Sequence, residues 1–489
     1  MSLELSSSWQ VLLSIWIIYE WVLRFVMIYI VPRRKSPSMA NGYLLLIMLV
    51  PTIGTILFVL FSEPKLSRVR RRQQRTVDAM TAEELHYISK NKSSSTGLPP
   101  NETQSLLARL AEVLGGFPVM TGNEVSFHTG YEESINEIVK AISKAKLYVH
   151  FEYFILVRDS STRVIFDELE KAQKRGVKVR VLYDRLISRR YPGHAEMISG
   201  FDNAKIEYHP MIPLSLIPGS KFTRPDLRNH RKIVIVDGDV AFTGSQNIVK
   251  RNYHRSDDLE YEEIVMKLRG PLVWQLNNVF RSDWFPESNE PLLDLVEKQD
   301  LPKKAGNVLG QVLPSGPSHQ EENNLRFYTS MVYAAKKRVG IVVPYFVPDD
   351  AFLDALTTAA QRGVEVVIIN SEAIDKIIVG RAQRSYYEEL LQAGVKIYLY
   401  DKPVFLHNKQ LLIDDEMAII GSSNLDVRSF ALDLELNVII YDRQTVKTLL
   451  GIESKYLQKS TQLTLSLWMK RPFRHKLSES LARITAPLQ

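Results

Sequence analysis

The stretch HRKIVIVDG at residues 230–238 organises this chain, because the chain repeats it as HNKQLLIDD at residues 407–415. Both copies have the pattern H-x-K-x4-D. Each copy runs into a glycine–serine turn that contains an asparagine, GSQN at residues 244–247 and GSSN at residues 421–424. The two copies lie 177 positions apart (407 minus 230), and the same kind of turn follows each of them. This repetition indicates a duplicated functional unit rather than a chance pair of basic residues.

The alternation of side chains along a β-strand predicts which residues of the first copy lie together. Residues two apart share a face of a strand, so His230 and Lys232 should point the same way. Ile233 and Ile235 should point to the opposite face, into a hydrophobic layer. An imidazole beside an ammonium group, with a side-chain amide nearby, suits the chemistry of a phosphodiester. The ammonium and the amide can hold the anionic oxygens while histidine attacks phosphorus or protonates the leaving oxygen.

Two such histidines can divide the work, one as nucleophile and the other as acid. The candidate residues of this kind are His230, Lys232 and Asn247 in the first copy, and His407, Lys409 and Asn424 in the second.

The aspartates of the two motifs have a different predicted role. Asp237 has the wrong parity to join His230, and Asp237-Gly238 is a strong hairpin signal. We therefore interpret Asp237 and Asp414 as carboxylates that support the end of a strand, rather than as groups that carry protons.

These residues resemble the phospholipase D superfamily, whose hallmark is a duplicated HxKxxxxD motif followed by GSxN. The sequence around the second copy is similar to that of bacterial cardiolipin synthases: PYFVP at 344–348, SYYEELLQAGVKIY at 385–398, FLH at 405–407 and GSSNLDVRSF at 421–430. The resemblance covers nearly the whole chain. It implies an α/β fold in which two duplicated phospholipase D-like halves pack about a pseudo-twofold axis and share one active site at their interface.

The resemblance also implies a reaction, in which two phosphatidylglycerol molecules give cardiolipin and glycerol through a phosphohistidine intermediate. By this analogy His230 is the nucleophile and His407 the acid and base, although the sequence does not order two equivalent motifs. No metal or other cofactor is needed, because one phosphoester bond is exchanged for another. A hydrolytic phospholipase D or another phosphatidyltransferase would use the same site. A nuclease of the superfamily would suit the basic charge but gains nothing from a membrane anchor, so no nucleic acid partner is expected.

An acidic residue in an apolar context follows each motif, Glu263 after the first and Glu435 after the second. In the family a carboxylate in this place orients each histidine and fixes its tautomer. Glu435 fits the family pattern of RSF followed by L-x-x-E. Glu263 lies in a stretch with other acidic residues that could form a solvated face instead: Asp257, Asp258, Glu260 and Glu262. The family usually has a glycine-containing loop after the first asparagine, whereas Asn247 is followed by IVKRNYH. This departure concerns which molecule accepts the phosphatidyl group and leaves the chemistry unchanged.

Composition limits the kinds of site that the chain can have. Its 489 residues include no cysteine, which excludes disulfides, a thiol nucleophile and cysteine-ligated metal. The ten histidines have no spacing comparable to H-E-x-x-H, so no metal site is predicted. A formal net charge of +7 favours anionic partners, either acidic lipid or nucleic acid.

Two apolar runs near the N-terminus predict a transmembrane helical hairpin, with helices at about 9–31 and 43–61. The first run contains Glu20 and Arg24, which are four residues apart and could neutralise each other; an interfacial helix is the alternative here. A cleaved signal peptide would account for one run and not for both. We therefore expect a multi-pass protein of the cell membrane, in contact with anionic lipid.

Basic residues follow the second apolar run: Lys65, Arg68, Arg70, Arg71, Arg72 and Arg75. They indicate either a solvated linker or a juxtamembrane segment that holds the catalytic part near anionic lipid. They outnumber the three basic residues between the two runs, which places both ends of the hairpin, and the catalytic part, in the cytoplasm.

Repeated features divide the rest of the chain. KRGVKV at 174–179 returns as QRGVEV at 361–366, where a predicted helix ends at glycine and a strand begins. The predicted parts are a hairpin at 1–62, a polybasic segment and linker at 63–116, a first half at 117–283, a connector at 284–320, and a second half with a C-terminal segment at 321–489.

From Leu463 to Lys476 apolar and basic residues predict a segment packed on the second half or, as the alternative, an interfacial segment. The oligomeric state stays open.

Overall fold

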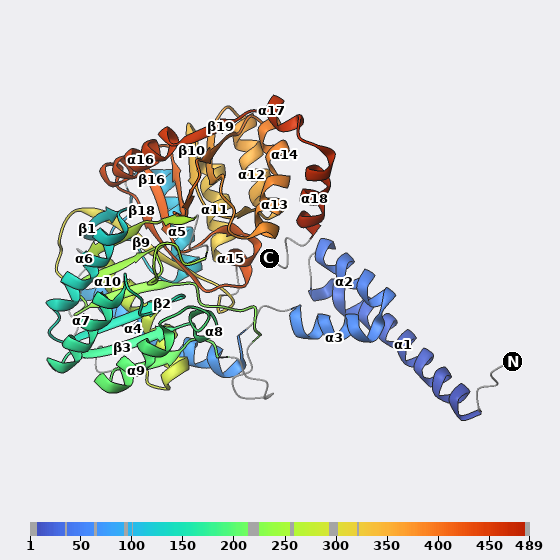
Figure 1. Cartoon of the computed structure of the whole chain (residues 1–489), viewed down its shortest axis with the longest axis horizontal. Helices are drawn as coiled ribbons and strands as arrows, with labels where there is room; N and C mark the ends of the chain where they lie inside the picture. Colours follow the sequence, from blue (N-terminus) through green and yellow to red (C-terminus); the bar gives the residue numbers. More distant parts are fainter. Residues whose placement is uncertain are drawn as a thin grey trace. The chain divides into compact units, whose positions relative to one another are not determined.

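The computed structural model describes residues 7–34, 37–62, 66–91, 96–99, 101–213, 224–254, 259–292, 302–319 and 322–484. The chain divides into two compact units, Met1–Lys65 and Leu66–Gln489. The first, here called the N-terminal unit, is helical. The second, here called the α/β unit, contains the sheet and both sequence motifs (Figure 1).

The N-terminal unit consists of α1 (Ser7–Arg34), α2 (Pro37–Leu49) and α3 (Pro51–Phe61). Among the residues that the structure describes, α1 alone contains a segment long and apolar enough to span a membrane, Trp9–Arg34, with a mean hydropathy of 1.9. The second predicted helix is broken at Val50, because Pro51 has no N–H to continue a helix and instead begins the next one. Helices of 13 and 11 residues reach only about 20 Å and 16 Å, against roughly 30 Å of bilayer core. The described residues therefore do not support the predicted hairpin of two spanning helices or the multi-pass topology.

A small core holds these three helices together. It contains Met27 and Val31 of α1, Ala40 and Ile47 of α2, and Phe58 of α3. The predicted neutralisation within the first run is confirmed, since Arg24 Nη2 lies 3.8 Å from an oxygen of Glu20.

One 15-stranded sheet runs through the described part of the α/β unit, and its strand order is symmetric. From the centre the order is β1-β8-β6-β5-β2-β3-β4 in one direction and β9-β18-β16-β15-β10-β12-β13 in the other, with β19 beyond β13. Three strands on each side, β2-β3-β4 and β10-β12-β13, pair parallel with one another. The other neighbouring strands of the sheet pair antiparallel. β1 and β9 pair antiparallel at the centre. A duplicated unit produces this order when its copies are related by a pseudo-twofold axis between β1 and β9.

The strands on the first side are β1 (Met120–His128), β2 (Tyr148–Tyr153), β3 (Lys178–Tyr183), β4 (Glu207–Pro210), β5 (Lys232–Val236), β6 (Val240–Gly244) and β8 (Val265–Arg269). Those on the second side are β9 (Val308–Ser315), β10 (Arg338–Val342), β12 (Glu365–Ser371), β13 (Lys396–Tyr400), β15 (Gln410–Ile413), β16 (Met417–Gly421), β18 (Glu435–Ile440) and β19 (Ser460–Leu463). Two short parallel pairs lie outside the sheet: β7 (Glu260–Glu262) with β14 (Val404–Leu406), and β11 (Phe346–Val347) with β17 (Leu425–Asp426).

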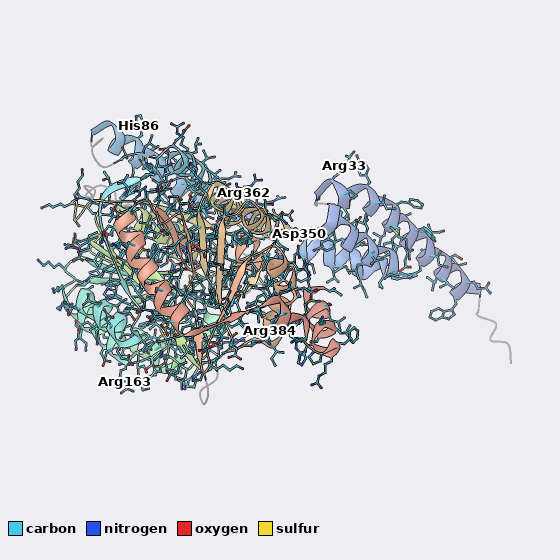
Figure 2. The ribbon with its side chains drawn as sticks, turned by 90° about the horizontal axis from the view of Figure 1, so that it is seen from above. Arg33, His86, Arg163, Asp350, Arg362 and Arg384 are labelled. Atoms are coloured by element: carbon cyan, nitrogen blue, oxygen red, sulfur yellow. The ribbon has the colours of Figure 1, made fainter. Side chains whose placement is uncertain are left out.

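Helices pack on the sheet through their apolar faces. In α7 (Arg163–Lys174) the buried residues include Ile165, Leu169 and Ala172, and the helix is followed by Gly176 at a φ of 92°, as predicted. The other helices are α4 (Arg68–Asn91), α5 (Glu102–Gly115), α6 (Tyr131–Ser143), α8 (Arg185–Ser188), α9 (His194–Ala204), α10 (Leu272–Ser288), α11 (Asn323–Ala334), α12 (Asp350–Gln361), α13 (Ile377–Ser385), α14 (Tyr387–Gln392), α15 (Val427–Ala431), α16 (Arg443–Gln458), α17 (Leu465–Met469) and α18 (Phe473–Ile484). Arg163 of α7 and Arg362, directly after α12, lie in different parts of the unit, as expected for equivalent helices of two halves (Figure 2).

The predicted alternation in β5 is confirmed. Ile233 and Ile235 belong to one hydrophobic cluster, and Val234 and Val236 belong to another. Apolar side chains therefore cover both faces of β5, which begins two residues after the first histidine.

Two segments that the sequence assigned to linkers are ordered parts of this unit. β9 lies inside the predicted connector at 284–320 but pairs with β1 and β18 at the centre of the sheet. Its eight residues are bounded by Pro and Gly residues, which hid a short strand among loop signals. The predicted linker at 63–116 contains α4 and α5. The buried residues of α5, including Leu107 and Ala111, join the core of the second half.

The polybasic run lies on α4, apart from Lys65, which is outside the described residues. Arg70 is buried and bonds to Glu287, with Nη2 2.8 Å from Oε2. Arg68, Arg72 and Arg75 are exposed and share one face of the helix. Arg71 is half-buried, and its Nε donates to the carbonyl of Leu66 at 3.1 Å. The structure therefore divides the described part of the run into two cations used in packing and three that face solvent.

Candidate active site

A short strand pair between the two halves positions His407. β7 of the first half pairs with β14 of the second, and the N–H of His407 donates to the carbonyl of Glu262 at 2.7 Å. Glu263 follows β7 directly, so it lies beside this histidine. Its Oε1 atom is 2.5 Å from Nδ1 of His407.

An equivalent contact positions His230. Asn229 forms a parallel bridge with Leu434, and the N–H of His230 donates to the carbonyl of Leu434 at 2.8 Å. Glu435, the first residue of β18, then lies with Oε1 and Oε2 3.1 Å and 3.2 Å from Nδ1 of His230. The carboxylate of each half therefore orients the histidine of the other half. The sequence predicted a carboxylate for each histidine but did not indicate that the pairs are crossed.

Both histidines lie just outside a strand, so the prediction that they lie within one is wrong. His230 precedes β5, and His407 lies between β14 and β15. The side chain of each lysine forms a hydrogen bond with the backbone carbonyl of the histidine in its own motif. Nζ of Lys232 donates to the carbonyl of His230 at 2.6 Å, and Nζ of Lys409 donates to the carbonyl of His407 at 2.9 Å. An ammonium group has three N–H donors, so two remain on each lysine for another acceptor.

The carboxylate contacts fix the tautomer of each histidine. In a neutral imidazole one nitrogen carries the proton and the other accepts. Because Nδ1 of each ring faces a carboxylate, the proton belongs on Nδ1, and Nε2 keeps its lone pair. Both rings line the same pocket. The pocket therefore combines two imidazoles whose Nε2 atoms are available to react.

Burial disfavours positive charge on the bases of the site. The pKa of His230 and that of His407 are held well below the usual value, first by burial and then by the neighbouring ammonium groups. Burial also lowers the pKa of Lys232 to about 8, and it lowers the pKa of Lys409 well below its ordinary value, with Lys232 adding to the effect. Without a bound anion, the site therefore favours neutral imidazoles.

The two carboxylates are shifted in the opposite direction, since burial disfavours their charged form. Burial raises the pKa of Glu263 to about 8 and that of Glu435 to about 7, against the pull of both lysines. Glu435 has additional donors: Ser422 Oγ bonds to Oε2, and Ser429 Oγ donates to Oε1 at 2.9 Å. The serine of the second GSSN turn thus fixes the carboxylate that orients His230.

The two asparagines that the sequence selected also line the pocket. Oδ1 of Asn247 accepts the N–H of Ile155 at 3.3 Å. Oδ1 of Asn424 is buried and has no hydrogen-bond partner among the described residues. A buried polar atom without a partner costs free energy, so Asn424 is suited to a ligand that supplies one.

The motif aspartates have positions that match their predicted structural role. Asp237 accepts the backbone N–H groups of Lys146, Leu147 and Tyr148, which lead into β2. Asp414 accepts those of the residues that lead into β10: Lys336, Lys337 and Arg338. Each aspartate has a positive φ, 53° and 52°, a conformation that Asp and Asn adopt more readily than most residues. Both carboxylates are therefore occupied in tying a turn to the neighbouring strand.

The pocket includes residues that the sequence analysis did not select. His254 lines it, and burial lowers the pKa of this histidine to about 4. The other unselected lining residues with polar groups are Tyr253, Tyr345, Lys376, Asp426, Arg428 and Asp433. Tyr253 directly precedes His254, and Tyr345 lies in the PYFVP stretch. Asp426 ends β17 and Arg428 lies on α15, both within the GSSNLDVRSF stretch. Lys376 and Asp433 lie on separate loops outside these stretches. Of the other acidic residues near Glu263, Asp257 and Asp258 lie outside the described residues.

The pocket is small, with a volume of about 100 Å³. Pockets for drug-sized ligands have roughly 300–1,000 Å³. This one therefore has room for a compact group such as a phosphodiester, and not for a long apolar chain. Within the described ranges, no group of three or more His, Asp or Glu residues is arranged to hold a metal ion.

Comparisons with known proteins agree with this geometry. The family described as cardiolipin synthase, PLD-like domain, matches residues 138–284 and 328–452. The cardiolipin synthase of Alkalihalophilus pseudofirmus is 33% identical over 95% of this chain and 92% of that protein. Cardiolipin synthase A of Wigglesworthia glossinidia brevipalpis is 30% identical over 98% of this chain and 96% of that protein. The crystal structure of phosphatidylserine synthase from Haemophilus influenzae shares the fold, with a TM-score of 0.59 and 17% identity over 79% of this chain and 98% of that one. The chain belongs to the cardiolipin synthase family of phospholipase D-like proteins.

Proposed function

We propose that this enzyme is a cardiolipin synthase that transfers a phosphatidyl group from one phosphatidylglycerol to a glycerol hydroxyl of another. The observation that carries the proposal is the pair of crossed His–Glu contacts, His230 with Glu435 and His407 with Glu263, around one pocket. Two oriented imidazoles are what a two-step exchange at phosphorus requires.

In the first step, Nε2 of His230 attacks the phosphorus of the donor lipid. The bond from phosphorus to the glycerol headgroup breaks, and His407 protonates the departing oxygen, so glycerol leaves and a phosphatidyl group remains on His230. In the second step His407 removes the proton from a headgroup hydroxyl of a second phosphatidylglycerol. That oxygen attacks phosphorus, the phosphorus–nitrogen bond breaks, and cardiolipin forms. Lys232, Lys409 and Asn424 are suited to hold the phosphate oxygens throughout.

The lowered pKa values of the bases also fit this scheme. A phosphodiester carries one negative charge, which offsets the repulsion among the ammonium groups and imidazoles when it binds. Binding of the donor should therefore raise the pKa of His407 and supply the proton that the leaving group needs. His230, held by Glu435 and its serine donors, should stay neutral and nucleophilic.

We further propose that α1 anchors the enzyme in the cell membrane. Its C-terminal end carries Arg33 and Arg34, whereas residues 1–8 contain no Lys or Arg, so the positive-inside rule places the C-terminal end in the cytoplasm. The α/β unit should then work at the cytoplasmic leaflet, with the exposed basic face of α4 towards anionic lipid. In this scheme the second half begins at β9, because β9 is the counterpart of β1.

The test is product analysis with detergent-solubilised, full-length enzyme and phosphatidylglycerol. Wild type should release glycerol and cardiolipin in equal amounts, and His230→Ala and His407→Ala should each abolish both products. His128→Ala, at the last residue of β1, is the matched control and should retain activity. Phosphatidic acid in place of cardiolipin would assign the chain to hydrolysis instead. Near wild-type turnover by either active-site variant would overturn the proposal.

A further inference from the structure

We propose that α13, α17 and α18 form a surface that docks on an anionic phospholipid bilayer beside the active site. This inference deepens the proposed function, and it rests on that function for the lipid nature of the substrate. We call the surface the apolar platform, and it consists of Ile377 and Ile378 on α13, Leu467 on α17, and Phe473, Leu477, Leu481 and Ile484 on α18.

The apolar stripe of α18 faces outwards. Its four platform residues follow at intervals of four, four and three, so they share one face of the helix. Phe473 is 77% exposed and Ile484 is 74% exposed. The residues that α18 buries are instead Glu479 and Ala482. A helix of a globular protein normally turns its apolar stripe towards the core, and α18 does the reverse among the described residues.

Specific contacts hold α18 in this orientation. Nη1 of Arg471 donates to the two oxygens of Glu479 at 2.5 Å and 2.6 Å, and the Arg471 guanidinium lies 3.2 Å from the ring centroid of Trp468. Trp468 and Ala482 are both part of the core of the second half. α18 packs along α13 at the edge of the α/β unit, and Arg384 of α13 lies beside these C-terminal helices (Figures 1 and 2). The outward stripe therefore belongs to a docked helix and not to a loose end.

The platform begins at the rim of the catalytic pocket. Lys376 lines that pocket together with both histidines. The next two residues are Ile377 and Ile378, which are 65% and 60% exposed. A pocket of about 100 Å³ holds the phosphodiester and leaves the acyl chains of the lipid outside. Those chains must then lie at the rim, where the platform supplies an apolar surface.

The charge around the platform selects the kind of bilayer. Basic residues flank it on α13 and α18, directly before α13 and directly after α17: Lys376, Arg381, Lys470, Arg474 and Lys476. Exposed apolar side chains bordered by lysine and arginine are typical of segments that lie in the interface of an anionic membrane. The occupant that fits both features is therefore a bilayer containing phosphatidylglycerol, the proposed substrate.

Contact with lipid can be measured without using activity. The chain contains no cysteine, so Phe473→Cys and Leu481→Cys each provide a unique site for an environment-sensitive fluorophore. The matched control is Val113→Cys on α5, at a residue that is 83% exposed and distant in sequence from the platform. In full-length protein in phosphatidylglycerol vesicles, both platform labels should shift to the blue and be quenched by acyl-chain nitroxides. The label at 113 should do neither.

A second measurement tests whether this contact serves the reaction. Leu477→Gln combined with Leu481→Gln should reduce turnover on long-chain phosphatidylglycerol vesicles by at least about tenfold, because two leucines no longer enter the lipid. Turnover on a short-chain, monomeric phosphatidylglycerol should stay at the wild-type level. Val113→Gln should change neither rate.

Each outcome separates the inference from its alternatives. Platform labels that remain in water on vesicles would overturn it. Labels that become buried with rising protein concentration in the absence of lipid would also overturn it and would indicate a second copy as the occupant. An equal loss on both substrates would assign the leucines to folding. If wild type makes no cardiolipin while the labels still enter the bilayer, the proposed function fails and the docking surface stands.

Discussion

Replacing Asp237 by asparagine should weaken folding and leave the chemical step intact. Asp237 lies in the turn between β5 and β6, with a φ of 53° that asparagine tolerates as well as aspartate. Its Oδ2 accepts the N–H of Lys146 at 2.8 Å, and its Oδ1 accepts those of Leu147 and Tyr148 at 2.7 Å and 2.9 Å. The substitution therefore changes the hydrogen bonds and not the backbone.

The size of the effect follows from these three bonds. In Asp237→Asn, one oxygen can still accept from Leu147 and Tyr148, but the amide nitrogen cannot accept from Lys146. A hydrogen bond to a charged group is worth about 1.5–3 kcal/mol, and the partial exposure of this turn favours the lower end, about 1.5–2 kcal/mol. If residues 66–489 unfold together, an unfolding entropy of about 2.1 cal/mol/K per residue converts this loss into a fall of roughly 2 °C in Tm.

The assay measures both quantities on the same preparation of full-length enzyme. Thermal unfolding gives Tm, and product formation per folded molecule gives kcat, which should stay within about threefold of wild type because the catalytic groups are untouched. Asp239→Asn is the matched control, since Asp239 lies in the same turn and its carboxylate forms a surface pair with Arg269 at 3.5 Å. That control should shift stability by less than about 0.5 kcal/mol. A variant Asp237→Asn with wild-type Tm and a kcat reduced by orders of magnitude would refute the structural role.

The remaining predictions concern the groups that act on phosphorus. Glu435→Gln should reduce kcat by roughly 10³–10⁴-fold, the scale of loss when an amide replaces the carboxylate behind a catalytic histidine. Its Tm should not fall above pH 7, because burial raises the pKa of Glu435 to about 7 and the ionised form is then buried at a cost. A fully active Glu435→Gln enzyme would contradict the assigned orientation of His230. Burial lowers the pKa of Lys232 to about 8, so the free enzyme loses this positive charge as pH rises through that value. We expect kcat/KM to decline above about pH 8, and a profile that is flat to roughly pH 10, near the ordinary value of lysine, would show that Lys232 does not titrate as proposed.

The sequence predicted those features that depend on short-range patterns. The repeated H-x-K-x4-D motif located both histidines and both lysines, and alternation within 232–236 predicted the two faces of β5. The parity of Asp237 predicted its separation from His230, because parity is a local property of a strand. The echo between 174–179 and 361–366 located β3 and β12 within two equivalent halves.

Other features depend on contacts between residues that are distant in sequence, and short-range sequence patterns do not reveal these contacts. β9 is a short strand among Pro and Gly residues, and only its pairing with β1 and β18 identifies it. The second apolar run has the composition of a spanning helix, but Pro51 within it ends one helix and begins the next. Lys376 and His254 enter the pocket from separate loops, so no spacing in the sequence marks them.

The crossed pairs have a consequence for how this enzyme becomes active. The opposite half holds each histidine by a backbone bond and a carboxylate, from Leu434 and Glu435 for His230 and from Glu262 and Glu263 for His407. Nδ1 of His230 also lies 3.2 Å from the carbonyl of Ser422. A half that folded alone would leave its histidine without the carboxylate that fixes the tautomer, and its glutamate without the imidazole that it orients. Docking of the two halves therefore completes both catalytic pairs at once, through β7–β14 on one side and the Asn229–Leu434 bridge on the other. Because neither pair can form before the other half is in place, a partly folded chain should not expose a reactive histidine to the membrane lipids around it.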